Sequence, residues 1–176
     1  MESGKILLHV CCAPCATSCV ERLLENRRHV VLFYSNSNID THEEYDKRLQ
    51  YIRQLALTFK VPLLIDPYDH DEWLQRIAGL EDEPEKGPRC VKCFDYSLKQ
   101  TAAKALETGI EAFTTTLSVS PHKKSQVIFN VGQRYHGFEN WNFKKLDGFK
   151  RSLELSKQLD LYRQAYCGCE FSKRTS

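Results

Sequence analysis

The sequence predicts a single α/β domain in which helices flank a parallel β-sheet. Short apolar runs, typical of buried strands, alternate with segments of helical periodicity along most of the chain. This alternation is typical of β-α-β units, which build parallel sheets. The length of 176 residues suits one domain with a substantial core, and no repeat, low-complexity segment or linker divides residues 1–176.

The first part of the chain predicts three strands joined by two helices. Ile6–Val10 is an apolar run that ends at a pair of cysteines, and Val30–Tyr34 and Val61–Ile65 are similar apolar runs. Between them, Ala16–Asn26 and Glu43–Phe59 carry apolar residues at helical spacing. Because a helix lies between consecutive strands, we expect all three strands to run in the same direction.

The second part of the chain continues the pattern with one more buried strand. A short helix is predicted at Asp71–Ile77, and the polar, acidic segment Glu81–Pro88 is predicted to be a loop. The periodic segment Val91–Glu107 predicts a long helix, and the apolar run Ile110–Thr116 predicts the fourth strand. Further elements are expected as helices at Gln126–Tyr135 and Ser152–Leu159 and a short strand at Trp141–Phe143.

Composition favours a cytoplasmic protein without a membrane partner. The apolar start Lys5–Pro14 is too short and too interrupted to span a bilayer, so neither a signal peptide nor a membrane segment is expected. In the cytoplasm, cysteine-rich patterns indicate metal binding or catalysis more often than disulfides.

The formal net charge of +2 is unevenly distributed along the chain. Residues 1–117 carry 14 Lys and Arg against 18 Asp and Glu, whereas residues 118–176 carry 11 against 5. The basic C-terminal third also contains interleaved aromatic residues, which suits an RNA backbone and unstacked bases, although a solvated helix face explains the same charges. The candidate RNA-binding residues are Lys123, Lys144, Lys145, Arg151 and Trp141.

Six of the eight cysteines occur in three groups that lie far apart in the chain. The groups are Cys11 with Cys12, Cys90 with Cys93, and Cys167 with Cys169. Thiolates are soft ligands that select zinc, copper(I) or iron–sulfur clusters. Because ligands from three remote segments can be assembled only by the fold, we expect these cysteines to converge on one metal site.

Polar and thiol side chains follow the predicted strands, at the edge where open parallel sheets bind ligands. Cys11 and Cys12 follow the first strand, and Tyr68 and Asp69 follow the third. The C-x-x-C pair stands at the start of a predicted helix, where the helix dipole and unpaired N–H groups stabilise thiolates. The sequence therefore places the candidate site at the carboxyl ends of the strands.

Several of these residues also have a simpler structural interpretation. Cys15 is equally suited to metal binding and to packing, and Cys19 is predicted to be a core residue because free cysteine is so often buried. Asp69 is either a metal ligand or acid, or the N-cap of the helix that follows. The C-x-x-C and C-x-C pairs together also suit a structural zinc site with four cysteine ligands.

Six motifs occur in a fixed order along the chain: His9–Cys15, Phe33–Ile39, Glu44 and Tyr45 with Arg48, Gly87–Cys93, Thr114–Pro121 and Tyr162–Cys169. Together they resemble the epoxyqueuosine reductase QueH family, and the resemblance extends from Leu7 to Ser172. One departure is Asn36-Ser37-Asn38, where the family usually has Asn-Pro-Asn.

The resemblance implies a cobalamin-independent reductase that acts on tRNA. Such an enzyme would reduce epoxyqueuosine at the anticodon wobble position to queuosine, the last step of queuosine biosynthesis, with an electron donor that stays unidentified. The family is similar to Rossmann-like or HUP-like sheets of the PP-loop type. This chain has cysteines where PP-loop proteins carry a phosphate-binding loop, so ATP binding is not expected.

Reduction of a C–O bond requires a redox cofactor, because no ordinary side chain supplies electrons. Iron–sulfur clusters usually take four cysteines, so we expect a [4Fe–4S] cluster within the six grouped residues. The two cysteines in excess suggest a second iron or other metal ion beside the cluster, or catalytic thiols. The candidate catalytic residues are Cys11, Asp69 as oxygen ligand or acid, and Tyr68. Tyr68 is a weaker candidate for proton donor, as are Tyr166 and Asp147.

Two alternative functions stay open at this point. One is an iron–sulfur tRNA thiolase, although no phosphate loop for activating a base is found. The other is a zinc-stabilised RNA-binding module without catalysis, which predicts a colourless protein with zinc in a closed site of four cysteines.

Overall fold

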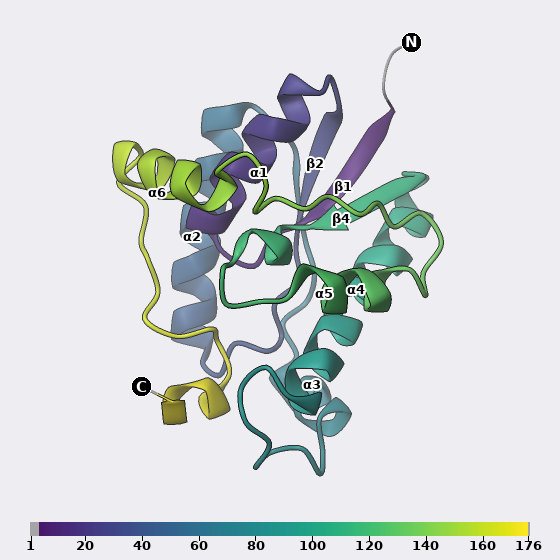
Figure 1. Cartoon of the computed structure of the whole chain (residues 1–176), viewed down its shortest axis with the longest axis vertical. Helices are drawn as coiled ribbons and strands as arrows, with labels where there is room; N and C mark the ends of the chain where they lie inside the picture. The colour runs from purple at the N-terminus through teal and green to yellow at the C-terminus, as the bar shows by residue number, and fades with distance from the viewer. Residues whose placement is uncertain (1–3, 176) are drawn as a thin grey trace.

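A computed structural model describes residues 4–175 and confirms the predicted α/β class (Figure 1). Its sheet has four parallel strands: β1 (Lys5–His9), β2 (His29–Tyr34), β3 (Leu63–Ile65) and β4 (Ala112–Thr115). Helices connect the strands, as parallel pairing requires. No helix among the described residues is long and apolar enough to cross a membrane.

The strand order β3-β2-β1-β4 places β1 in the interior of the sheet. In the register, His9 of β1 lies opposite Phe33 of β2 and Thr115 of β4. The chain builds β2 and β3 on one side of β1 and then returns to place β4 on the other side. The strand order therefore reverses between β1 and β4, and this switch point is where open α/β sheets bind ligands.

Six α-helices and two 3₁₀ turns accompany the strands in the described residues. They are α1 (Ala13–Glu25), α2 (His42–Phe59), α3 (His70–Arg76), α4 (Pro88–Thr108), α5 (Ser125–Gly132), α6 (Gly148–Gln158), η1 (Thr116–Val119) and η2 (Glu170–Thr175). Local sequence sets the helix ends. Pro14 stands in the first turn of α1, Thr41 caps α2 by accepting the Glu44 N–H at 3.2 Å, and α4 ends at Gly109 in the left-handed region.

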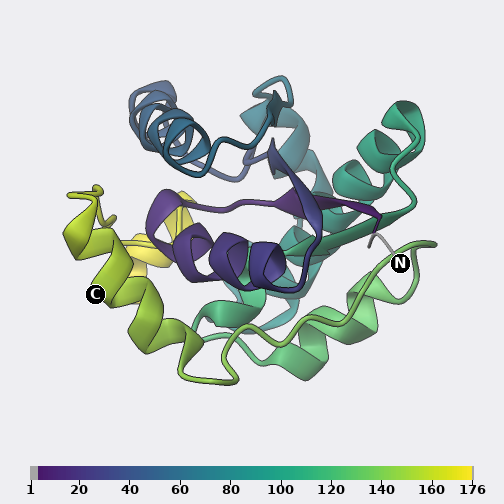
Figure 2. The same ribbon diagram turned by 90° about the horizontal axis from the view of Figure 1, so that it is seen from above.

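Successive residues of β1 point to opposite faces of the sheet and feed two separate core clusters. Ile6 and Leu8 pack with residues of α1 and α2, whereas Leu7 packs with residues of α4 and α5. Burial of a side chain such as Leu8 contributes about 1.5–3 kcal/mol. Seen from above, α6 lies beside α1, against which it packs (Figure 2).

The prediction of a short strand at Trp141–Phe143 is wrong. Phe138 makes the isolated bridge to Phe113, after which the chain leaves the sheet. The hydroxyl of Ser118 donates to the Trp141 carbonyl at 2.7 Å and accepts the Phe143 N–H at 3.2 Å. One side chain thus satisfies the backbone groups that a neighbouring strand would otherwise pair.

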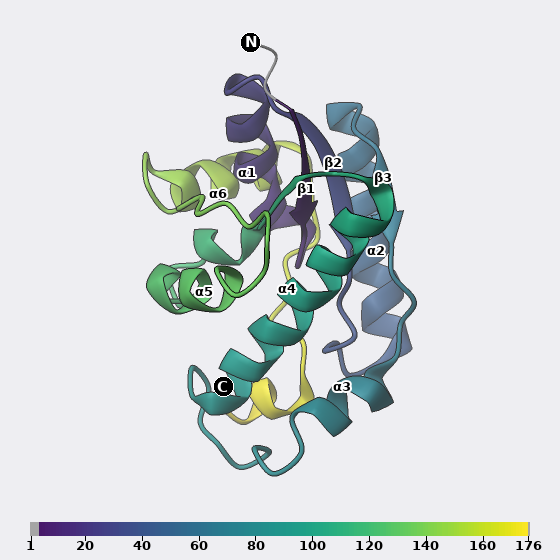
Figure 3. The same ribbon diagram turned by 90° about the vertical axis from the view of Figure 1, so that its right-hand side faces the viewer.

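The segment after α6 carries the last two cysteines and has no regular structure before η2. It runs past α2 and ends beside α3 and the amino-terminal end of α4 (Figures 1 and 3). There, Cys169 and Phe171 pack with Trp73 of α3 and Tyr96 of α4. The C-terminal cysteines are thereby brought to the helix that carries Cys93.

Candidate metal centre

The first cysteine group lies at the switch point between β1 and β4. Cys11 stands two residues after the end of β1, and its N–H donates to the hydroxyl of Thr116, just beyond β4, at 3.3 Å. The Cys11 thiol lies 3.3 Å from the same hydroxyl. These contacts fix Cys11 at the edge of the sheet where the fold class binds ligands.

Cys12 and Cys15 join Cys11 through the start of α1. Cys12 is the N-cap residue and Cys15 stands in the first turn, so both sulfurs are carried by the positive end of the helix. The three sulfurs lie within 4.8 Å of one another, and no other group of three or more potential ligands is this tight in residues 4–175. Hydrogen bonding by Cys11, and then by Cys15, holds the pKa of Cys12 well below its usual value.

The second group combines the start of α4 with the C-terminal segment. Cys90 and Cys93 lie in the opening turns of α4, as predicted from the sequence. Together with Cys167 and Cys169 they line a small cavity of about 80 Å³. Burial, and after it the charge of nearby Cys167, raises the pKa of the Cys93 thiol.

A larger cavity of about 700 Å³ connects the two groups. Its wall includes Cys11 and Cys15 from the first group and Cys93 and Cys167 from the second. The fold therefore brings all three cysteine segments to one place. Such a concentration of soft donors suits zinc or an iron–sulfur cluster, and it exceeds what one four-ligand centre requires.

Lys123 lies against both cysteine groups. It was expected to bind RNA, but its partly buried side chain lines both cavities. Burial opposes its charge, yet the neighbouring thiols of Cys167 and Cys11 outweigh this effect and raise the pKa of Lys123. A cation at this position offsets the negative charge that thiolates would accumulate.

Cys15, which by sequence suits metal binding and packing equally, lies at the start of α1. It stands three residues after the N-cap Cys12, and this spacing returns a side chain to the same end of the helix. Cys19, one turn further on, is 0% exposed and packs in the core, as predicted. The distance from the start of α1 therefore distinguishes Cys15, which lies beside the other thiols, from Cys19, which lies in the core.

Asp69 and Tyr68 lie outside the walls of the two cavities. The exposed Asp69 accepts the Glu72 N–H at 2.9 Å and caps α3. The Tyr68 hydroxyl donates to the Ile39 carbonyl at 2.5 Å. Tyr166 does line the larger cavity, and its hydroxyl donates to Asp40 at 2.6 Å.

The remaining RNA-binding candidates differ in how far their side chains are engaged within the chain. Lys144 donates to the Lys123 carbonyl, and Arg151 pairs with Glu21 through two contacts of 2.8 and 2.9 Å. The indole N–H of Trp141 donates to Glu139 at 2.7 Å, and its ring stacks on Phe143. Lys145 is exposed.

Comparisons with known proteins all indicate the same family. A family profile described as Epoxyqueuosine reductase QueH matches residues 6–175. The chain belongs to the epoxyqueuosine reductase QueH family. The resemblance inferred from the six motifs is thereby confirmed, and the cysteine-bearing QueH motifs are those that meet at the two cavities.

Relatives named Epoxyqueuosine reductase QueH match nearly the whole chain. The protein from Streptococcus pyogenes serotype M1 is 40% identical over 180 residues, covering 96% of this chain and 70% of that protein. The protein from Acinetobacter baylyi is 38% identical, covering 98% of this chain and 82% of that protein. The protein from Thermotoga maritima is 34% identical, covering 96% of this chain and 90% of that protein.

Proposed function

We propose that this protein is an epoxyqueuosine reductase that acts on tRNA in the cytoplasm and completes queuosine biosynthesis. The observation that carries the proposal is the convergence of three cysteine segments on one cavity at the switch point of the sheet, in a chain of the QueH family. In the reaction, both C–O bonds of the epoxide break and an alkene forms between the two carbons. Two electrons and two protons convert the departing oxygen to water.

We infer that the electrons reach the epoxide through a [4Fe–4S] cluster, without cobalamin. The donor set fits this cofactor, because thiols converge at the cavities and the pKa of Cys12 is lowered, which favours the thiolate that binds metal. When bound, the cluster would supply single electrons received from an external donor. Four of the six grouped cysteines would hold it, and the others, with Cys15, would bind a second metal ion or act as thiols.

The other cavity residues suit a polar substrate and the delivery of protons. A volume of about 700 Å³ falls within the range of small-molecule sites, which supports the proposal that the modified base enters this space. Lys123 would offset negative charge beside the reacting atoms. Tyr166, which lines the cavity, is proposed as a proton donor ahead of Tyr68 and Asp69, which lie outside its wall.

The function is tested with tRNA that carries epoxyqueuosine. Anaerobically reconstituted protein and a chemical reductant should remove one oxygen atom from the modified nucleoside, as read by nucleoside mass analysis. Protein that binds this tRNA and carries a full cluster, but never removes oxygen, would contradict the reductase assignment and favour a binding or thiolation role.

The basic C-terminal third is proposed to bind the anticodon stem-loop, and Lys145 offers the clearest test. Lys145→Glu should weaken binding of a stem-loop severalfold, because contacts of exposed lysines with phosphate release counterions. Binding should be measured over a range of salt concentrations, with the metal spectrum as a check on the site.

Lys5→Glu is the matched control, since the exposed Lys5 begins β1 at the opposite end of the strand from Cys11. It applies the same charge reversal and should leave stem-loop affinity unchanged. The proposal is contradicted if Lys145→Glu and Lys5→Glu lose affinity equally, or if affinity does not depend on salt. In either case the excess positive charge of the C-terminal third has no specific role in RNA binding.

A further inference from the structure

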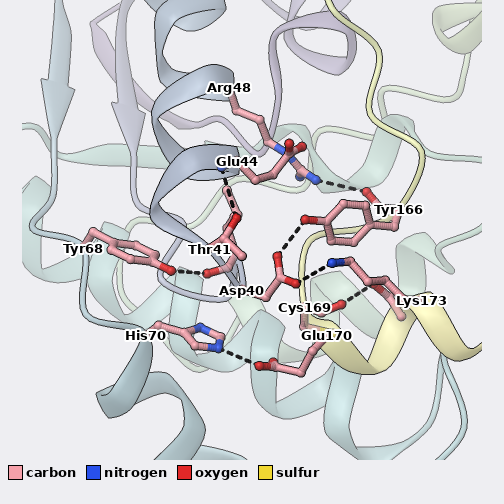
Figure 4. A network of polar contacts seen from close by, with 12 residues as sticks. Asp40, Thr41, Glu44, Arg48, Tyr68, His70, Tyr166, Cys169, Glu170 and Lys173 are labelled. Atoms are coloured by element: carbon pink, nitrogen blue, oxygen red, sulfur yellow. Dashed lines mark hydrogen bonds and ion pairs between the residues drawn. The ribbon is translucent and has the colours of Figure 1, made fainter.

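The segment that carries Cys167 and Cys169 is attached to α2 through Arg48 (Figure 4). The Arg48 side chain donates from Nη1 to the Cys167 carbonyl at 2.8 Å and from Nη2 to the Tyr166 carbonyl at 3.1 Å. Arg48 is only 3% exposed, so both bonds are shielded from competing water. One guanidinium thus holds two consecutive peptide groups next to the C-x-C pair.

Glu44 fixes the orientation of this guanidinium. It lies one turn earlier on α2 and accepts Arg48 Nε at 2.8 Å. The same carboxylate accepts the Tyr162 hydroxyl, with O···O distances of 3.1 and 3.2 Å. Because Glu44 balances the buried charge of Arg48, the guanidinium can keep its remaining N–H groups for the C-terminal segment.

Backbone conformation favours glycine between the two cysteines. Gly168 has a φ of +151°, which residues with a Cβ rarely adopt, and a Cβ added there would lie 3.0 Å from Asn38 Nδ2. The Gly168 carbonyl accepts the Asp40 N–H at 3.0 Å. The segment is therefore docked in one defined position, although it has no secondary structure of its own.

We propose that Arg48, oriented by Glu44, is the positioning residue that fixes residues 166–169 and so delivers Cys167 and Cys169 to the metal centre. The motif formed by Glu44, Tyr45 and Arg48 thereby has a structural role, the positioning of residues 166–169, which is separate from the chemistry of the proposed reaction. The inference builds on the proposed metal centre. It can be tested on the thiols alone, without turnover.

The test compares Arg48→Lys with the wild-type protein in the reduced, metal-free state. Lysine keeps the positive charge but cannot hold Glu44 and two carbonyls at once. Cys169 is 8% exposed and should react slowly with iodoacetamide in the wild type. In Arg48→Lys its alkylation, followed by peptide mass analysis, should be at least about tenfold faster, the factor expected for loss of one charge-assisted hydrogen bond.

Two controls separate positioning from general destabilisation. Cys19 in the core is an internal reporter, and its alkylation rate should not change. Arg28→Lys makes the same substitution in the bidentate pair that Arg28 forms with Glu139, and it should leave the Cys169 rate at the wild-type value. Iron bound per chain after anaerobic reconstitution should fall in Arg48→Lys and stay unchanged in Arg28→Lys.

The inference is overturned if Cys169 in Arg48→Lys reacts at the wild-type rate, or if Cys19 accelerates in parallel. If Arg48→Lys fails to fold, Glu44→Gln is tested in its place, because it removes the charge that orients Arg48. The same quantities are measured: the alkylation rates of Cys169 and Cys19 and the iron bound per chain. A wild-type Cys169 rate in that variant would also overturn the inference. A protein that shows the expected thiol rates but never removes oxygen from epoxyqueuosine would contradict the proposed function alone.

Discussion

Replacing Cys12 with serine is expected to abolish epoxide reduction. Cys12 is the N-cap residue of α1, its sulfur lies close to those of Cys11 and Cys15, and its pKa is lowered, so it is the thiol best prepared to bind metal as thiolate. Serine keeps the size but stays protonated and is a hard, poor ligand. The rate of oxygen loss from epoxyqueuosine in tRNA should fall on the order of a thousandfold or more, as for other groups at a reacting centre.

Cys19→Ser is the matched control for this experiment. It makes the same substitution two turns further along α1, where the thiol packs in the core and donates to the Cys15 carbonyl at 3.2 Å. It should cost roughly 1 kcal/mol of unfolding free energy and leave the reduction rate intact. Wild-type turnover by Cys12→Ser would remove Cys12 from the proposed centre.

Replacing Cys93 with serine is expected to strip metal from the protein. Cys93 is the cysteine of α4 that lines both cavities, whereas Cys90 lines only the smaller one. Loss of an outer-shell partner already lowers metal affinity by about 10–100-fold, so loss of a ligand should cost at least that much. Iron and acid-labile sulfide per chain, measured after anaerobic reconstitution, should fall well below the wild-type content.

The metal content of Cys19→Ser provides the comparison for Cys93→Ser, and it should equal that of the wild type. A Cys93→Ser protein with full iron content and full turnover would make Cys93 a packing residue beside Trp73. Loss of turnover with full iron content would instead place Cys93 among the surplus thiols rather than the cluster ligands.

The strands and helices were largely predictable because their periodicities arise from burial on the two faces of one sheet. Helix starts were less predictable. Residues 13–15 belong to α1, although the periodic pattern begins only at Ala16, because Pro14 is well suited to a first turn. The Trp141–Phe143 segment has a strand-like composition, but the long-range contact with Ser118 determines its conformation.

The residues of the site were easier to predict from the sequence than their arrangement in space. The shared thiolate chemistry of the three cysteine groups indicated that they belong together. The Cys167 carbonyl accepts a hydrogen bond from Arg48, which is 119 residues away in the chain, and no local pattern encodes such a contact. Asp69 shows the opposite case, since its capping of α3 is local and was one of the two interpretations that the sequence allowed.

The central claim, a redox-active metal centre built from the three cysteine segments, is tested most directly by metal analysis of anaerobically purified protein. The protein should be brown, contain iron and acid-labile sulfide, and lose its visible absorbance on addition of dithionite. A colourless protein that contains zinc alone and still reduces epoxyqueuosine in tRNA at its full rate would contradict the claim.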